Sequence, residues 1–217
     1  DELGALSHQR ARKAITGGLF NEEIVPVVIP QRKGEPLVFD TDERPMDTSA
    51  EKLAELRPAF KKDGTVTAGN TCGINDGAAA VLIMSDAKAK ELGLKPLVKI
   101  RASSSGGLDP AYMGLGPVPA VRKILDSQKL SIDDFGAVEL NEAFAAQAIA
   151  CVRELQCDMD KTNPLGSGIS IGHPIGCTGA RIIVTLMGEM LRREHALGLA
   201  SLCIGGGQGM AMVLEKV

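Results

Sequence analysis

The stretch from Ala137 to Leu155, AVELNEAFAAQAIACVREL, decides the fold class of this chain. Its first four residues, Ala137–Leu140, form a short apolar strand pattern, and the residues from Glu142 to Leu155 follow with the spacing of a helix. A strand that leads directly into a helix is the repeating unit of α/β proteins. We therefore expect a strand over 137–140 and a helix over 142–155.

The same alternation continues on both sides of this unit. Strand patterns lie at 97–102, 199–204 and 210–215, and helix patterns lie at 120–125 and 179–193. Strands that alternate with helices predict an α/β fold in which helices cover the faces of a sheet.

The N-terminal part has a different texture. Residues 1–16 have helical spacing, residues 24–29 form a short strand pattern, and residues 30–65 are polar and rich in charge, with one helix expected near 49–56. This long excursion is more typical of a lid or an insertion than of a core.

A small-residue segment follows the excursion. Residues 75–80 predict the start of a helix, residues 81–84 are apolar as in a strand, and a helix capped by Ser85 is expected to run to Leu92. An apolar segment of this kind needs partners that cover it.

Composition narrows the functional class. The 217 residues are 44% hydrophobic, enough for one large domain or two small ones with an adequate core, as in a soluble globular protein. A net charge of −3, the absence of Trp and a single Tyr argue against a nucleic-acid partner. No apolar run is long enough to predict a membrane span. The five cysteines form no CxxC pair, which favours a reduced intracellular setting, cytoplasmic or mitochondrial.

Three glycine-bounded segments carry the candidate chemistry. Cys203 precedes three glycines, whose N–H groups can point at one spot, although a lone Cys on an apolar strand is usually a small core residue. His173 lies between Gly172 and Pro174, a frame that restricts the backbone, and His is the commonest general acid or base. Asn141 is either the N-cap of the following helix or an active-site group at a strand end.

The spacing of these residues supports a common site. Asn141 and His173 lie 32 residues apart and His173 and Cys203 lie 30 apart, about one strand–helix unit each. An amide, an imidazole and a thiol together suggest acyl transfer.

The strings NEAFAAQ at 141–147, GHPIGCTG at 172–179 and CIGGGQG at 203–209 resemble the three C-terminal signature segments of the thiolases, that is, of acetyl-CoA acetyltransferases and 3-ketoacyl-CoA thiolases. The order and spacing of the segments match as well. Further similar segments run through the chain: LRPAF at 56–60, TVTAGN at 65–70, NDGAA at 75–79 and MGLGP at 113–117.

The resemblance implies a role for each catalytic residue. His173 would activate a nucleophilic cysteine and bind the thioester oxygen, together with a water held by Asn141. Cys203 would shuttle the proton at the substrate α-carbon or the leaving thiol. The backbone N–H of Gly205 would contribute to a second oxyanion hole.

The resemblance also implies contacts with coenzyme A and a domain organisation. The candidate contact residues are Arg44, Ala68, Cys72, Met113 and Phe144, where Arg44 is alternatively a solvated loop charge and Cys72 replaces a serine of many thiolases. Residues 1–73 would be the end of the loop domain that covers coenzyme A. Residues 74–96 would be the last helix and strand of an otherwise missing N-terminal domain, and residues 97–217 the C-terminal domain, with a mixed sheet covered by helices.

One catalytic part is missing from the pattern. In the family the acyl-carrying cysteine lies in the N-terminal half, and none of the five cysteines here has its sequence context. We therefore expect this chain to be the C-terminal portion of a thiolase that is inactive without an N-terminal half, supplied by a second chain or a nicked fragment. The chain opens at Asp1 as though it began partway through a larger protein.

The remaining expectations follow from the same resemblance. The substrates would be coenzyme A thioesters, with no other cofactor and no metal, and the whole protein would be a homo-oligomer, a dimer or a tetramer. The alternative is a non-catalytic thiolase-like module that binds coenzyme A or acts as a scaffold.

Overall fold

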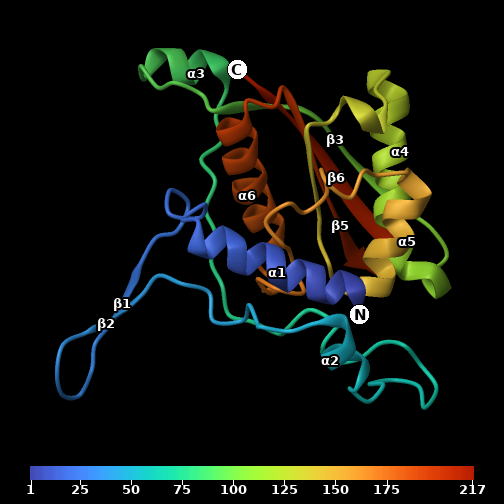
Figure 1. The fold of residues 1–217 in the computed structure, drawn as a ribbon. Coiled ribbons are helices and arrows are strands. Elements are labelled where there is room, and N and C mark those ends of the chain that lie inside the picture. Colours follow the sequence, from blue (N-terminus) through green and yellow to red (C-terminus); the bar gives the residue numbers. More distant parts are fainter.

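The computed structural model describes all 217 residues as a four-stranded mixed sheet covered by helices, with an N-terminal part that lies along one edge (Figure 1). The elements, in chain order, are α1 (Glu2–Thr16), β1 (Val27–Ile29), β2 (Leu37–Phe39), α2 (Ala50–Ala54), α3 (Asp86–Glu91), β3 (Val98–Gly107), the 3₁₀ helix η1 (Pro110–Leu115), α4 (Pro117–Gln128), the 3₁₀ helix η2 (Ile132–Asp134), β4 (Ala137–Leu140), α5 (Ala145–Leu155), α6 (Thr178–Arg193), β5 (Leu197–Gly205) and β6 (Gln208–Lys216).

The sheet has the strand order β3-β6-β5-β4. β3 pairs antiparallel with β6, β6 pairs antiparallel with β5, and β5 pairs parallel with β4. The parallel pair is joined by the long connection that contains α5 and α6, as a parallel pair requires. The expected mixed sheet covered by helices is therefore confirmed.

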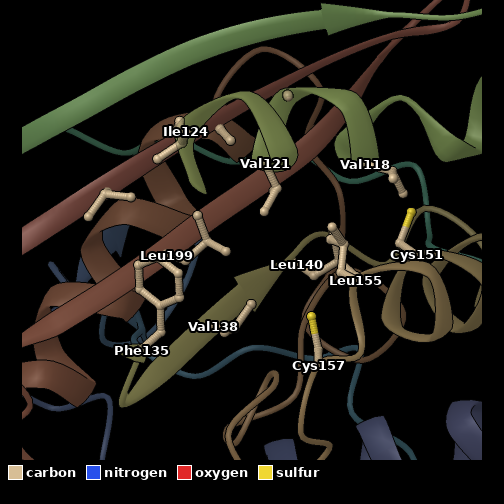
Figure 2. Packing of buried hydrophobic residues seen from close by; sticks show 13 residues of the cluster. Val118, Val121, Ile124, Phe135, Val138, Leu140, Cys151, Leu155, Cys157 and Leu199 are labelled. Carbon is tan, nitrogen blue, oxygen red and sulfur yellow. The ribbon is translucent and has the colours of Figure 1, made fainter. Parts of the chain in front are cut away.

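Helices cover both faces of this sheet, and each face has its own core. On one face, apolar residues of α4 and α5 pack on β4, β5 and β6 (Figure 2). On the other face, Ile182, Leu186 and Met190 of α6 pack on alternate residues of the same strands. Because side chains alternate along a strand, β4 sends Val138 and Leu140 to the first core and Ala137 to the second.

Most predicted elements are confirmed, with small changes at their ends. The strand at 137–140 and the helices α1, α3 and α6 lie where the patterns placed them. β3 runs on to Gly107, and α4 extends from Pro117 to Gln128 because proline is tolerated in the first turn of a helix.

The helix expected from Glu142 starts three residues later, at Ala145. Residues 143–145 pair with an N-terminal segment instead: the Cys72 N–H donates to the Ala143 carbonyl at 3.0 Å and the Ala145 N–H donates to the Asn70 carbonyl at 2.8 Å. Tertiary hydrogen bonds thus override the local helix preference, and the N-cap is Phe144, so the N-cap interpretation of Asn141 is wrong.

The helix and strand predicted over 75–84 are absent from this structure. Their residues form no regular hydrogen bonding, and Ile74, Leu82 and Ile83 have relative exposures of 101%, 80% and 68%. Short helices and single strands depend on tertiary packing, and no other part of this chain covers these side chains.

The N-terminal part packs against the rest through α1. Leu3 of α1 belongs to a small core with Ala145, Ala148 and Ile169 beside α5. The strand expected at 24–29 shortens to 27–29 and pairs with β2 in an exposed hairpin that extends away from the sheet (Figure 1). No helix of the protein combines the length and apolar character that crossing a bilayer requires.

Candidate active site

Asn141 and Cys203 lie at the same edge of the sheet. Asn141 follows the last residue of β4, and its N–H donates to the Ser201 carbonyl of β5 at 3.0 Å, two residues before Cys203. Because β4 and β5 are parallel, both residues belong to carboxyl ends of strands. This is the edge where α/β sheets place ligands and reacting groups.

Cys203 is half-buried, rather than buried as its apolar strand predicted, and its thiol lies between a donor and an acceptor. The Sγ atom donates to the Met113 carbonyl of η1 at 3.4 Å and accepts from the Gly205 N–H at 3.5 Å. The carbonyl stabilises the protonated thiol, whereas the N–H stabilises the thiolate. A thiol with both partners is positioned to give up and take back a proton.

The glycine turn after Cys203 requires glycine at each of its three positions. Gly205, Gly206 and Gly207 have φ angles of +94°, +59° and +83°, in the left-handed region that L side chains rarely adopt. At Gly205 and Gly206 the space around the missing side chain is open. At Gly205 and Gly206, therefore, the backbone conformation rather than packing requires glycine. This conformation turns the Gly205 N–H toward the Cys203 thiol.

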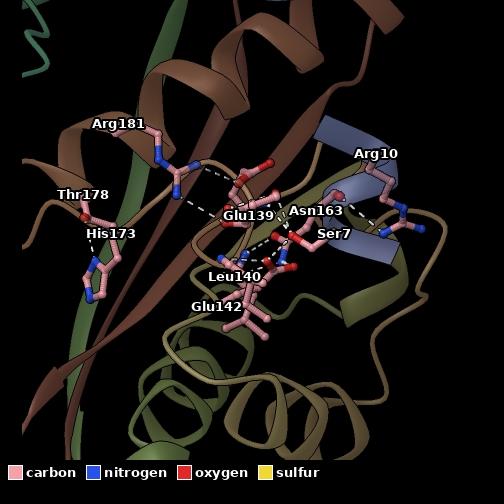
Figure 3. Close-up of polar contacts among 12 residues, drawn as sticks. Ser7, Arg10, Glu139, Leu140, Glu142, Asn163, His173, Thr178 and Arg181 are labelled. Carbon is pink, nitrogen blue, oxygen red and sulfur yellow. Dashed lines mark hydrogen bonds and ion pairs between the residues drawn. The ribbon is translucent and has the colours of Figure 1, made fainter. Parts of the chain in front are cut away.

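His173 is half-buried in the loop before α6. Its Nδ1 lies 2.7 Å from the hydroxyl of Thr178, the first residue of α6 (Figure 3). Burial lowers the pKa of the imidazole, and the positive charge of Arg181 lowers that pKa further. The neutral imidazole, which can accept a proton, is therefore favoured.

Asn141 is 1% exposed, and its side-chain oxygen has no hydrogen-bond partner. A Cβ on Gly168 would lie 2.8 Å from this oxygen, so the absence of a side chain at 168 leaves it room. Buried polar atoms of native proteins usually have a partner. An orphaned amide oxygen at the carboxyl edge of the sheet is therefore a place for a water or a ligand donor.

A buried polar cluster fixes the segment that contains Asn141. The Glu142 carboxylate accepts from the Ser7 hydroxyl at 2.6 Å, from the Asn163 amide at 3.0 Å and from the Ile169 N–H at 3.3 Å (Figure 3). These three partners come from α1 and from the loop before α6. Glu142 thus joins the N-terminal part to the candidate site.

A second buried pair links β4 to α6. Arg181 Nη1 lies 3.6 Å from Glu139 Oε2, and the Arg181 Nη2 donates to the Ser167 hydroxyl at 3.3 Å (Figure 3). The distance to Glu139 is too long for a hydrogen bond. Burial raises the pKa of Glu139 to about 8, more than the charge of Arg181 lowers it, so Glu139 is protonated at neutral pH.

The candidate coenzyme A residues Arg44, Cys72 and Phe144 gather beside Asn141. Arg44 donates from Nε to the Ile169 carbonyl at 2.7 Å and from Nη2 to the Thr71 carbonyl at 2.9 Å, so its interpretation as a solvated loop charge is wrong. Thr71 forms a β-bridge with Phe144, next to the bond between Cys72 and Ala143. Burial raises the pKa of the Cys72 thiol.

Ala68 and Met113 are less closely linked to this group. Ala68 is exposed in the turn between Thr67 and Asn70. The side chain of Met113 is 49% exposed, while its carbonyl holds the Cys203 thiol. Contacts of any of these residues with coenzyme A stay a prediction.

The structure joins the predicted residues only in part. Cys203 contacts Met113 and Gly205 directly, and Asn141 lies beside the strand of Cys203, but no hydrogen bond joins His173 to Asn141 or to Cys203. Cys151 and Cys157 are buried in the core, where burial raises the pKa of each thiol to about 11. Such thiols are inert as nucleophiles. No group of three or more His, Cys, Asp or Glu side chains is placed to hold a metal ion.

Sequence reasoning missed the buried polar residues behind the site. Glu139 is a carboxylate in an otherwise apolar four-residue strand, and Arg181 is a cation in the first turn of a helix, where cations are disfavoured. Both are departures from the local rule that a sequence reading can detect. Thr178 gave no such signal, since threonine is ordinary at a helix start.

Models of known protein families match most of this chain. A family model described as "Thiolase, C-terminal domain" matches residues 94–216, and another described as "Thiolase, N-terminal domain" matches residues 1–87. The acetyl-CoA acetyltransferase of Pseudomonas aeruginosa is 55% identical over 217 residues, which is 100% of this chain and 55% of that protein.

Solved structures extend this similarity to the fold. The crystal structure of the Bacillus anthracis acetyl-CoA acetyltransferase superposes with a TM-score of 0.96 at 52% identity, covering 100% of this chain and 55% of that one. The human mitochondrial 3-ketoacyl-CoA thiolase in complex with CoA superposes with a TM-score of 0.93 at 42% identity, covering 99% and 53%. The chain therefore spans about half the length of the relatives it matches.

Proposed function

The chain belongs to the thiolase family, and from that premise we propose that it is the C-terminal part of an enzyme that transfers acyl groups to or from coenzyme A. The reaction would be the Claisen condensation of two acetyl-CoA molecules or the thiolytic cleavage of a 3-ketoacyl-CoA. The observation that carries this proposal is the Cys203 thiol held between the Met113 carbonyl and the Gly205 N–H.

Each site residue has a chemical role in this proposal. Cys203 moves the proton of the substrate α-carbon, because its thiol has both a donor and an acceptor. The Gly205 N–H stabilises the oxyanion of an acyl-enzyme. His173 activates the nucleophilic thiol, and its lowered pKa supports a base that is neutral before the reaction.

Asn141 completes the first oxyanion hole through a water. Its amide oxygen is buried and unpartnered, which leaves room for one donor, and a water that donates to this oxygen can donate its second hydrogen to a thioester oxygen. Enolate charge that develops on that oxygen is stabilised by such fixed donors.

The nucleophilic thiol comes, in this proposal, from an N-terminal part outside these 217 residues. Cys151 and Cys157 are buried with raised pKa values, and burial also raises the pKa of Cys72 and Cys177. None of the four therefore has the lowered pKa of an activated thiol. The exposed apolar residues of 74–84 offer the surface on which that part would pack.

The domain assignment follows from this arrangement. Residues 1–73 form the end of the loop domain over coenzyme A, residues 74–96 complete the N-terminal domain, and residues 97–217 form the C-terminal domain. The partner is the remaining half, on a second chain or as a nicked fragment, and the whole assembles as a dimer or tetramer. Coenzyme A thioesters are the substrates, without a metal or another cofactor.

A second candidate is a thiolase-like module that binds coenzyme A or acts as a scaffold without catalysis. The observation that favours it is that burial raises the pKa of Cys72, Cys151, Cys157 and Cys177, so none of these four is an activated thiol. Under this alternative the positions of Cys203 and His173 serve binding only.

The two candidates differ in a complementation assay. The 217-residue chain is mixed with the N-terminal half of one of the similar acetyltransferases, and acetoacetyl-CoA cleavage is measured with each part alone and with both. We expect activity only with both parts, and its loss with His173→Gln but not with the matched control His195→Gln. His195 follows α6, whereas His173 precedes it, about 24 Å away along the helix axis.

Two results would contradict parts of this proposal. Coenzyme A binding by the mixture without any cleavage would support the binding module. Full cleavage activity with His173→Gln would show that His173 is not the base.

A further inference from the structure

Thr178 has an unusual position relative to the proposed base. It is the first residue of α6 and is completely buried. Its hydroxyl oxygen lies 2.7 Å from His173 Nδ1 (Figure 3). The same oxygen lies 2.9 Å from the Pro174 carbonyl oxygen. A side chain with a single hydrogen to donate therefore has two polar neighbours.

The chemistry of these neighbours determines where the hydrogens lie. A carbonyl oxygen can only accept, so in the contact between Thr178 and Pro174 the hydroxyl is the donor. If the hydroxyl donated to His173 instead, two oxygen atoms would face each other at 2.9 Å with no hydrogen between them. The Thr178 oxygen is then an acceptor, and the group that donates to it is His173 Nδ1–H.

We propose that Thr178 is a positioning residue that keeps neutral His173 in the Nδ1–H tautomer, so that Nε2 is the unprotonated nitrogen available as a base. This inference rests on the proposed function for the role of that base, but the tautomer itself does not. His173 Nε2 points away from Thr178 and makes no hydrogen bond within the protein (Figure 3).

The loop around His173 supports a fixed geometry. Gly172 has a φ of +115° and Pro174 restricts the backbone on the other side. The N–H groups of Cys177 and Thr178 also donate to the Pro174 carbonyl, at 2.8 and 2.9 Å, so this turn does not depend on the hydroxyl. Removing the hydroxyl therefore changes the partner of the imidazole while two backbone bonds hold the loop.

Nitrogen-15 NMR of the imidazole tests the tautomer directly in the 217-residue chain. The chain has only three histidines, and His173→Gln identifies the signals of His173. In the wild type we expect a protonated Nδ1 and an unprotonated Nε2 at neutral pH. In Thr178→Val, which has nearly the same shape, the ratio of Nδ1–H to Nε2–H should fall roughly fivefold or more, because Nδ1–H loses its acceptor.

Thr178→Ser is the conservative control, because it retains the hydroxyl. We expect it to keep the wild-type tautomer. If Thr178→Val failed to fold, the tautomer of the wild-type chain would still test the inference. A wild-type chain with the Nε2–H tautomer would overturn the inference, and so would a Thr178→Val variant that keeps Nδ1–H fully populated.

The activity of the complemented enzyme tests whether the tautomer of His173 matters for catalysis. Thr178→Val should lower kcat roughly tenfold to a hundredfold with little change in KM, within the usual contribution of a general base, and Thr178→Ser should restore it. An unchanged kcat despite a changed tautomer would overturn the positioning role. Absence of activity with the wild-type chain would instead contradict the proposed function and leave the tautomer result standing.

Discussion

Arg181 of α6 lies 3.6 Å from Glu139 of β4, where both side chains are largely buried, yet the two side chains form no hydrogen bond. Burial dominates, and it raises the pKa of Glu139 to about 8. The folded protein therefore holds a proton on Glu139 that the unfolded chain releases near pH 4.5.

This proton makes stability depend on pH. Between pH 6.5 and about 8 the folded state binds one more proton at Glu139 than the unfolded state, so the free energy of unfolding should fall as pH rises, by up to about 1.4 kcal/mol per pH unit. Burial also raises the pKa of Glu142, which adds a change of the same sign. Urea unfolding at several pH values measures the slope.

Glu139→Gln should reduce this slope, because it removes the carboxyl group whose folded-state pKa is raised to about 8. Exposed Glu91→Gln on α3 is the matched control and should leave the slope unchanged. The window begins at pH 6.5 because Glu23, with a folded-state pKa of about 6, titrates below it. His8, whose folded-state pKa is about 4, still takes up a proton near pH 6.5 in the unfolded chain and adds a slope of opposite sign at the lower end of the window, in the variant as in the wild type. A slope in Glu139→Gln equal to that of the wild type would contradict the assignment.

Cys203→Ser tests whether the acidity of the Cys203 thiol, rather than its position, is needed for activity. Serine retains a hydroxyl between Met113 and Gly205 but is a far weaker acid than a thiol. We expect kcat of the complemented enzyme to fall roughly 10²- to 10⁴-fold, with the free energy of unfolding within about 0.5 kcal/mol of wild type. A loss of kcat that is accompanied by a comparable loss in the free energy of unfolding would mean that Cys203 contributes to packing rather than to proton transfer.

Arg44 should hold the loop before Cys72 to the site. Arg44→Lys keeps the charge but cannot reach both the Ile169 and Thr71 carbonyls with a planar fork. We expect faster hydrogen exchange at the Cys72 N–H, which is bound to Ala143. Exposed Arg32→Lys serves as the control. Unchanged exchange together with weaker coenzyme A binding would favour a direct contact between Arg44 and the nucleotide.

Gly209 of β6 should not tolerate a side chain. A Cβ there would overlap the Gly116 carbonyl, where the backbone after η1 meets the sheet. Gly209→Ala should destabilise the protein by about 1–3 kcal/mol and disturb the Met113 carbonyl that holds Cys203. Gly176→Ala, which meets no atom within 4 Å, should be nearly neutral in unfolding experiments.

The core between α4, α5 and the sheet should be sensitive to the loss of side-chain volume. Ile124 of α4 is buried in the same core cluster as Leu199 of β5 and Phe135 (Figure 2), and Ile124→Ala should cost about 2–5 kcal/mol in the free energy of unfolding. Exposed Leu92→Ala after α3 should cost less than about 0.5 kcal/mol. Similar losses for both would mean that α4 does not pack as described.

Much of the fold could be predicted from the sequence, because local periodicity reports burial. The alternation within 137–140 and the helical spacing of 179–193 placed β4 and α6 correctly. The segment 75–84 shows the limit of this reasoning: its pattern is equally local, but its apolar side chains are exposed and no regular structure forms. A pattern predicts an element only where another surface covers it.

The sequence by itself determined the family and the α/β class, and it predicted the candidate residues Asn141, His173 and Cys203, because these depend on residue types in a fixed order and spacing. Only the tertiary structure decided the start of α5 at Ala145, the buried pair of Glu139 and Arg181, and the contact between Thr178 and His173. These features arise from hydrogen bonds and burial between segments far apart in the chain, which no local pattern encodes.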